Sequence, residues 1–182
     1  MRLPTALEEV LSRAVSLLER ERIAYMVIGG FALPAYGAIR ATLDLDIAAR
    51  IRTAKAFEAF IGRARESGFE PQIASFSSPV DVFMDSKAGL EVEFWLRPDG
   101  IDWDSELLRR RKRARIGRVD VWLVPPEDFI VSKLSRPDRG VQDEKDVKSI
   151  LIRLGEAIDT AYLRRRARKA GVTALLQAVE RA

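Results

Sequence analysis

The sequence predicts an α/β (α+β) fold in which a mixed β-sheet is flanked by helices and followed by a helical C-terminal part. Three observations support this prediction. Residues 5–22 carry apolar side chains at helical spacing, which is typical of an amphipathic packing helix. Short apolar runs between residues 24 and 124 alternate with helical patterns and with glycine-containing turns. The last third of the chain has the spacing of helices alone.

Apolar periodicity and helix-capping residues place the individual elements. Strands are expected over residues 24–28, 43–48, 69–73, 80–84, 90–96, 114–116 and 119–124. Helices are expected over residues 5–22, 31–37, 53–66, 102–113, 125–134, 142–154, 159–169 and 172–181. Turns at 86–89 and 117–118 predict two hairpins. Thr5 with Glu8 has the spacing of a capping box, and Thr53 is positioned to cap the helix that follows it.

Composition limits the function classes that need to be considered. The length of 182 residues suits one domain, or one domain with a helical appendix. We predict a main domain over residues 1–136 and a helical C-terminal extension over residues 137–182, which together can pack as one domain. Since the chain has no cysteine, disulfides and thiolate metal sites are excluded. Since it has no histidine, a Ser–His triad and the usual zinc ligand are excluded as well. Catalysis would therefore depend on carboxylates, lysine, arginine, tyrosine or a metal ion that prefers oxygen ligands.

Charge and hydropathy favour a cytoplasmic protein with anionic partners. The net charge is +4 and the pI is about 9.6, which makes nucleotides or nucleic acid plausible ligands. Charged residues recur through the first 22 residues, so we expect no signal peptide. The longest uncharged run, residues 23–39, is short for a membrane span and contains glycine and proline. We therefore expect no membrane partner.

The candidate chemistry centres on residues 27–47. Gly29 and Gly30 follow an apolar strand and precede a short helix, which leaves backbone N–H groups at a helix N-terminus where a phosphate can bind. In the next strand, Asp44 and Asp46 are two residues apart and therefore share one face. Carboxylates held side by side repel one another, and a divalent cation such as Mg²⁺ relieves that repulsion.

A third acidic position is expected on an adjacent strand. Residues 90–96 offer Glu91 and Glu93, which share one face because side chains alternate along a strand. Two Mg²⁺ ions held by such carboxylates can clamp the attacking and leaving oxygens in phosphoryl or nucleotidyl transfer. The candidate metal ligands are Asp44, Asp46, Glu93 and Glu91.

As a set, these motifs resemble the nucleotidyltransferase superfamily that shares the DNA polymerase β fold. One part of the resemblance is Gly29-Gly30-Phe31-Ala32 followed by Arg40-x-Thr42-x-Asp44-x-Asp46. A second part is VPPEDFIVSKL at residues 124–134, which resembles the family's Pro-Glu-Asp-Leu…Lys-Leu helix, and a third is the following segment with Asp143 and Asp146. Over residues 25–154 the chain is similar to the AbiEii-like and minimal nucleotidyltransferases of toxin–antitoxin and abortive-infection systems.

The resemblance implies Mg²⁺-dependent transfer of a nucleoside monophosphate from an NTP to a hydroxyl or phosphate, with release of pyrophosphate. It implies that Asp44, Asp46 and a third acid are catalytic and bind two Mg²⁺ ions. Glu93 is preferred as the third acid because an apolar strand end follows it, and Glu91 is the rival. The nucleotide-binding residues it implies are Gly29, Gly30, Arg40, Thr42 and Lys133, the last as a point charge near the phosphates.

The expected acceptor depends on the role of two runs of basic residues, at residues 109–118 and 164–169. Such runs are usually solvated helix faces, but their density also suits contact with a polyanion. If they bind nucleic acid, a tRNA 3′ end is the expected acceptor. If they do not, a partner protein in a toxin–antitoxin pair is expected.

Two alternatives belong to other function classes. The first is a catalytically weak or inactive protein of the same fold that binds and neutralises a partner protein or RNA. The second is an arginine-rich RNA-binding module, whose affinity for RNA would fall as salt is raised.

Overall fold

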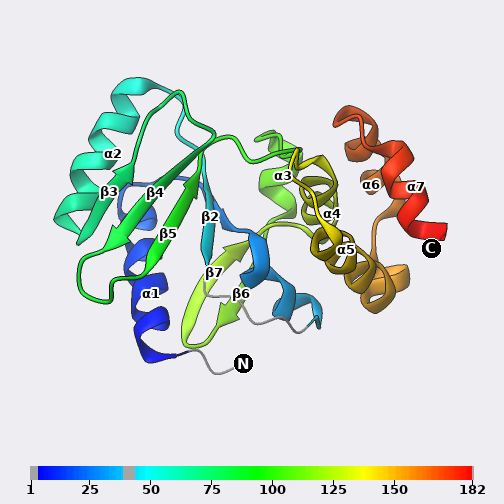
Figure 1. Cartoon of the computed structure of the whole chain (residues 1–182), viewed down its shortest axis with the longest axis horizontal. Coiled ribbons are helices and arrows are strands. Elements are labelled where there is room, and N and C mark those ends of the chain that lie inside the picture. Colours follow the sequence, from blue (N-terminus) through cyan, green and yellow to red (C-terminus); the bar gives the residue numbers. More distant parts are fainter. Residues whose placement is uncertain (1–3, 39–43, 182) are drawn as a thin grey trace.

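A mixed β-sheet lies at the centre of the computed structural model, which describes residues 4–38 and 44–181 (Figure 1). The strands in this part of the chain are β1 (Tyr25–Val27), β2 (Leu45–Ala49), β3 (Phe69–Ile73), β4 (Val80–Asp85), β5 (Glu91–Trp95), β6 (Lys112–Ile116) and β7 (Val119–Leu123). They pair in the order β3-β4-β5-β2-β1-β7-β6. The β2–β5 and β1–β7 pairs are parallel and the other neighbours are antiparallel. The predicted fold class is confirmed.

Helices lie on both sides of this sheet. They are α1 (Thr5–Arg20), α2 (Ala54–Glu66), α3 (Ser105–Arg110), α4 (Pro126–Ser135), α5 (Val141–Leu154), α6 (Thr160–Lys169) and α7 (Thr173–Arg181), with 3₁₀ segments η1 (Gly29–Tyr36) and η2 (Gly155–Ala157). In Figure 1, α3 to α7 lie together on the side of the sheet away from α2, and the C-terminus lies there too. Within the described ranges, no helix is long and apolar enough to cross a membrane.

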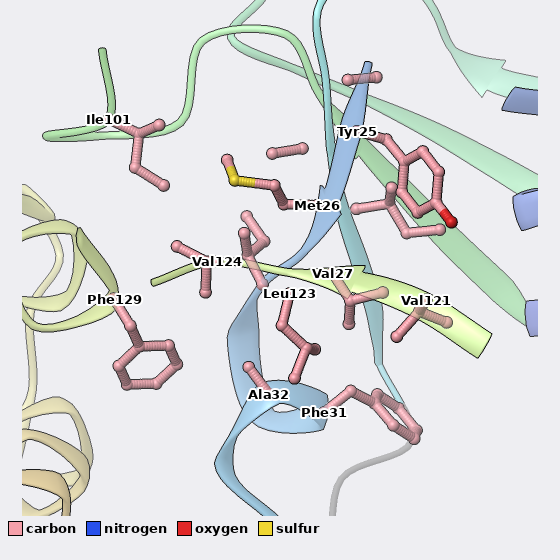
Figure 2. Close-up of a cluster of buried hydrophobic side chains, with 14 of the residues drawn as sticks. Tyr25, Met26, Val27, Phe31, Ala32, Ile101, Val121, Leu123, Val124 and Phe129 are labelled. Atoms are coloured by element: carbon pink, nitrogen blue, oxygen red, sulfur yellow. The ribbon is translucent and has the colours of Figure 1, made fainter. Parts of the chain in front are cut away.

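Two clusters of side chains within the one continuous apolar core bear on the site. Phe60 of α2 packs edge-to-face on Phe94 and Phe83, with ring centroids 5.1 and 5.9 Å away, and thereby covers β4 and β5. Figure 2 shows the second cluster, where Met26 of β1 lies near Val124 and where Phe129 approaches from α4. The first set of contacts holds α2 on β4 and β5, and the second brings α4 to the core.

Most predicted elements are confirmed within one or two residues. The two hairpins form as expected across the turns at 86–89 and 117–118. Thr53 caps α2, since its hydroxyl accepts the N–H of Ala56 at 3.2 Å. The predicted strand over residues 43–48 is observed from Leu45 to Ala49, and residue 43 lies outside the described residues.

The helix predicted over residues 102–113 is too long. It is limited to α3, because the backbone becomes extended at Arg111 and the next residues join β6. In the strand, Arg113 stacks on Trp122 of β7 and forms an ion pair with Glu19 of α1. These tertiary contacts override the helical propensity of the arginine-rich run.

The capping box predicted at Thr5 and Glu8 is wrong. Pro4 is the N-cap residue of α1, and no side chain caps that helix. Glu8 instead pairs with Arg118 in the turn between β6 and β7, so its carboxylate stabilises a long-range contact rather than the start of its own helix.

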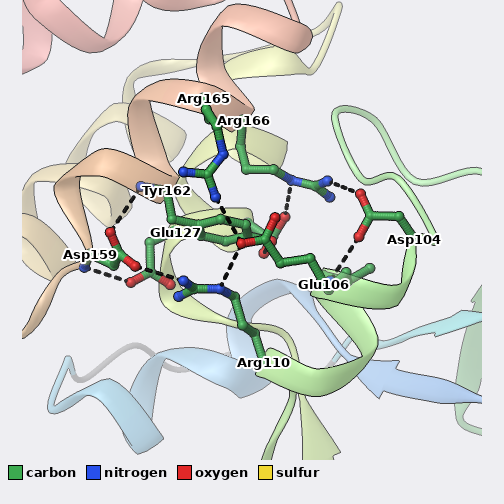
Figure 3. Close-up of polar contacts among 10 residues, drawn as sticks. Asp104, Glu106, Arg110, Glu127, Asp159, Tyr162, Arg165 and Arg166 are labelled. Atoms are coloured by element: carbon green, nitrogen blue, oxygen red, sulfur yellow. Dashed lines mark hydrogen bonds and ion pairs between the residues drawn. The ribbon is translucent and has the colours of Figure 1, made fainter.

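A buried arginine ties α6 to α3 and α4 (Figure 3). Arg166 Nε donates to Asp128 Oδ1 at 2.8 Å, and its Nη1 donates to Asp104 Oδ2 at 2.6 Å. Tyr162 donates to the second oxygen of Asp128 at 2.7 Å. Burial raises the pKa of Asp128 to about 6, although Arg166 and Tyr162 oppose the shift. This tie crosses the boundary predicted near residue 136, and the division into two domains stays a prediction.

Arg166→Ala should lower the free energy of unfolding by about 3–5 kcal/mol, because it leaves the Asp128 carboxylate buried without its counter-charge. Arg164→Ala is the matched control, since Arg164 is exposed on the same helix and should change stability by less than about 0.5 kcal/mol. Urea unfolding of both variants at pH 7.5 measures the difference. Equal, small losses in the two variants would contradict the proposed role of Arg166.

Candidate active site

The turn between β1 and η1 brings the backbone against a carboxylate. Gly29 has φ +62°, a left-handed conformation that favours glycine. A Cβ at this position would lie 1.9 Å from Asp46 Oδ2, so a side chain here would displace the carboxylate. The N–H of Ile28 donates to the backbone carbonyl of Asp46 at 3.0 Å and fixes the turn to β2. Glycine is therefore required at position 29 for conformation and for space.

Asp46 and Glu93 lie side by side as register partners on the parallel strands β2 and β5. Trp95 Nε1 donates to Glu93 Oε2 at 2.9 Å and to Asp46 Oδ1 at 3.4 Å. Burial, followed by the hydrogen bond and charge of Glu93, raises the pKa of Asp46 to about 7, while Trp95 and Lys133 oppose the shift. Two acidic side chains held side by side in this way attract a cation.

The other two predicted metal ligands are placed differently from this pair. Asp44 directly precedes β2, is exposed and lines the same pocket as Asp46 and Glu93. Glu91 is exposed at the start of β5 and is not among the described residues that line this pocket. The geometry therefore favours Glu93 over Glu91 as the third acid.

Lys133 reaches the pocket from α4 and is held by α5. Its Nζ lies 2.8 Å from Asp143 Oδ1 and 3.5 Å from Asp146 Oδ2, and only 6% of the residue is exposed. The other oxygen of Asp143 accepts the N–H of Gly140 at 3.1 Å, so the same carboxylate fixes the start of α5. The lysine charge is thereby held in place at the pocket wall, where it suits a phosphate group.

One pocket of about 350 Å³ gathers most of the predicted site residues, and its volume lies in the range of small-ligand sites. The predicted residues in its wall are Gly29, Gly30, Asp44, Asp46, Glu93 and Lys133. Further polar residues in its wall are Trp95, Asp99, Ser132, Arg136 and Asp138. The predicted nucleotide-binding residues Arg40 and Thr42 lie outside the described residues.

A model of one protein family matches most of the chain. Residues 7–173 match the family model described as "Nucleotidyl transferase of unknown function (DUF2204)". The chain belongs to this family. No curated protein matches the sequence.

Solved structures of other proteins share the fold of this nucleotidyl transferase. The antibiotic-resistance factor ANT(2″)-Ia is 14% identical, with a TM-score of 0.61 over 99% of this chain and 100% of that chain. The lincomycin-bound lincosamide antibiotic adenylyltransferase LnuA is 13% identical, with a TM-score of 0.55 over 82% and 96%. An antigenic nucleotidyltransferase-like protein from Paracoccidioides brasiliensis is 19% identical, with a TM-score of 0.56 over 100% and 94%. At these identities the likeness shows the fold.

The donor set of the pocket fits a divalent cation that prefers oxygen. Asp46 and Glu93 offer adjacent oxygen donors on neighbouring strands, and both line the pocket. Among the described residues, no group of three acidic side chains is arranged as a complete metal site. Mg²⁺ usually keeps several waters and is bound by one or two carboxylates together with substrate phosphates, which is the number of carboxylates that this pair offers.

Trp95 and Arg136 are site residues that the sequence analysis missed. Trp95 follows Glu93 by two residues and shares its strand face, so the alternation rule applied to Glu91 and Glu93 also identifies it. Arg136 follows α4, three residues after Lys133, and pairs with Asp138 at 2.8 Å. The backbone at Arg136 is extended and lies beyond the helix, so no helical spacing from Lys133 identifies this second residue.

Gly29→Ala should lower the free energy of unfolding by roughly 1–3 kcal/mol, because alanine disfavours the left-handed conformation and its methyl group meets Asp46. Gly62→Ala is the matched control, since Gly62 is exposed in α2 with no atom near its added Cβ, and it should gain up to about 1 kcal/mol. Urea unfolding measures both changes. A Gly29→Ala protein as stable as the control would contradict the close approach of the turn to Asp46.

Proposed function

We propose that this chain is a Mg²⁺-dependent nucleotidyltransferase that moves a nucleoside monophosphate from an NTP to a hydroxyl or phosphate acceptor. The observation that carries the proposal is the Asp46–Glu93 carboxylate pair, which shares one pocket with the Gly29–Gly30 turn. Membership of a nucleotidyl transferase family supports the reaction class.

The residues of the pocket divide into phosphate-binding and metal-binding groups. Gly29 and Gly30 line the pocket at the N-terminal end of η1, where backbone N–H groups and the helix dipole favour an anion such as a triphosphate. Lys133 adds a fixed positive charge at the pocket wall. Asp46 and Glu93, joined by Asp44, would hold Mg²⁺. When bound, the ion neutralises charge that develops on the phosphates during transfer.

The transfer exchanges one bond to the α-phosphorus for another. The acceptor oxygen forms a bond to the α-phosphorus while the bond from that phosphorus to the bridging oxygen of the β-phosphate breaks, and pyrophosphate leaves. The acceptor oxygen loses one proton in this step. Glu93 is the proposed base, since it lies in the pocket beside Asp46 and its carboxylate can accept that proton.

The ion pairing of the basic runs bears on the proposed acceptor. Arg113, Arg115 and Arg118 pair with Glu19, Asp120 and Glu8 respectively. In the second run, Arg165 pairs with Glu106 and Lys169 with Asp102. Carboxylates are therefore interspersed among these cations, and this mixed pattern favours an acceptor other than tRNA.

Structural relatives point toward a small acceptor that bears a hydroxyl group. LnuA has been solved with lincomycin, and ANT(2″)-Ia has been solved in complex with adenylyl-2″-tobramycin. We therefore place a small hydroxyl-bearing molecule first among the proposed acceptors. A partner protein in a toxin–antitoxin-type pair comes second, and a tRNA 3′ end comes third.

Asp46→Asn and Glu93→Gln should each lower nucleotidyl transfer roughly a hundredfold to a thousandfold, because several kcal/mol of charge stabilisation is lost. Glu91→Gln should retain activity, since Glu91 lies outside the pocket wall. The assay follows label from α-³²P NTPs to pools of hydroxyl-bearing small molecules, cell protein and total tRNA, with Mg²⁺ or with EDTA.

Two outcomes would overturn this function. The first is that no label reaches any acceptor while the protein captures and neutralises the product of a neighbouring gene equally well with both substitutions. That result would favour the binding protein over the enzyme. The second is label transfer that is the same in wild type and in Asp46→Asn, which would place catalysis elsewhere in the chain.

A further inference from the structure

One neutral hydrogen-bond donor serves both carboxylates of the candidate site. Trp95 Nε1 lies 2.9 Å from Glu93 Oε2 and 3.4 Å from Asp46 Oδ1. An indole has a single N–H and no acceptor, and its ring allows only a few orientations. The donor is therefore directed to the narrow space where the two acidic side chains meet.

The sheet places the indole at this point. Trp95 follows Glu93 by two residues on β5 and so projects from the same face. Its register partner on β2 is Ala48, whose methyl group leaves room for a large ring next to Asp46. Ala48 is fully buried. A larger side chain at position 48 would compete with the indole for that space.

The contact also assigns different roles to the oxygens of each carboxylate. Asp46 Oδ1 is turned toward Trp95, whereas Oδ2 is the oxygen that a Cβ on Gly29 would meet. Glu93 accepts the indole N–H through Oε2 rather than through Oε1. One oxygen of each acid is thus held by the indole.

We propose that Trp95 is a positioning residue of the nucleotidyl-transfer site, whose indole N–H orients Asp46 and Glu93 so that one oxygen of each is available to a divalent cation. The proposal depends on the proposed function for the identity of the reaction. The hydrogen bonds from Trp95 to the two acids do not depend on it. A neutral donor suits this task because it adds no charge. An arginine at position 95 would neutralise the acids and compete with the cation.

Trp95→Phe tests the proposal because it keeps an aromatic ring and removes the N–H. The apparent Kd for Mg²⁺, measured by calorimetry with a non-hydrolysable NTP analogue present, should rise about tenfold or more, as when a partner that orients a metal ligand is lost. Trp122→Phe is the matched control, since Trp122 stacks on Arg111 and Arg113 away from the pocket. It should leave the Kd unchanged.

A second measurement needs no change at Trp95. The sequence has three tryptophans, so a ¹H–¹⁵N spectrum of wild type contains three indole N–H signals, which Trp103→Phe and Trp122→Phe are enough to assign. Addition of Mg²⁺ to protein that already contains the non-hydrolysable NTP analogue should move the Trp95 signal and leave the other two in place. If Trp95→Phe fails to fold, Trp103→Phe and Trp122→Phe still assign the Trp95 signal by elimination.

The outcomes separate this inference from the proposed function. A stationary Trp95 signal, or a Mg²⁺ affinity of folded Trp95→Phe equal to that of wild type, would overturn the role of Trp95 even if the wild type transfers nucleotides. A moving Trp95 signal together with weakened Mg²⁺ binding in the variant would support that role even if no acceptor is ever labelled.

Discussion

The parallel pairing of β2 with β5 sets Asp46 opposite Glu93, and the candidate chemistry depends on that register. The pairing is held from the opposite face by buried apolar side chains, which include Ile47 of β2 and Phe94 of β5. Phe94 in turn packs on Phe60 of α2. Because side chains alternate, a slip of one residue would move a carboxylate into this apolar layer and expose Ile47 or Phe94. The core therefore fixes the geometry of the site as well as the stability of the fold.

Helix α4 couples the pocket to the C-terminal helices. It is buried along almost its whole length, and two of its buried charges take their partners from later helices. Lys133 is paired with Asp143 of α5, and Asp128 is paired with Arg166 of α6. A buried charge that loses its partner is strongly destabilising, so the placement of α4 depends on α5 and α6. Residues outside the pocket wall thereby determine where the lysine charge lies.

Local patterns predicted the elements of this fold well because turns, caps and apolar periodicity are short-range features. The Gly29–Gly30 turn and the acidic faces of β2 and β5 followed from spacing of one or two residues. The pairing of β2 with β5 was expected only in general terms, because register depends on packing between segments almost 50 residues apart. The end of α3 and the partner of Glu8 were missed for the same reason, since Arg113 and Arg118 make contacts that no local pattern contains.

The charge of the pocket opposes that of the whole chain. The net charge is +4, yet the pocket wall contains five acidic residues and two basic ones among the described residues. The two basic residues, Lys133 and Arg136, already have carboxylate partners in Asp143 and Asp138. A triphosphate is itself strongly anionic, so like charges would repel it from such a pocket. Divalent cations that arrive with the nucleotide would remove this conflict. The charge balance of the pocket thus supports the proposed metal dependence separately from the geometry of Asp46 and Glu93.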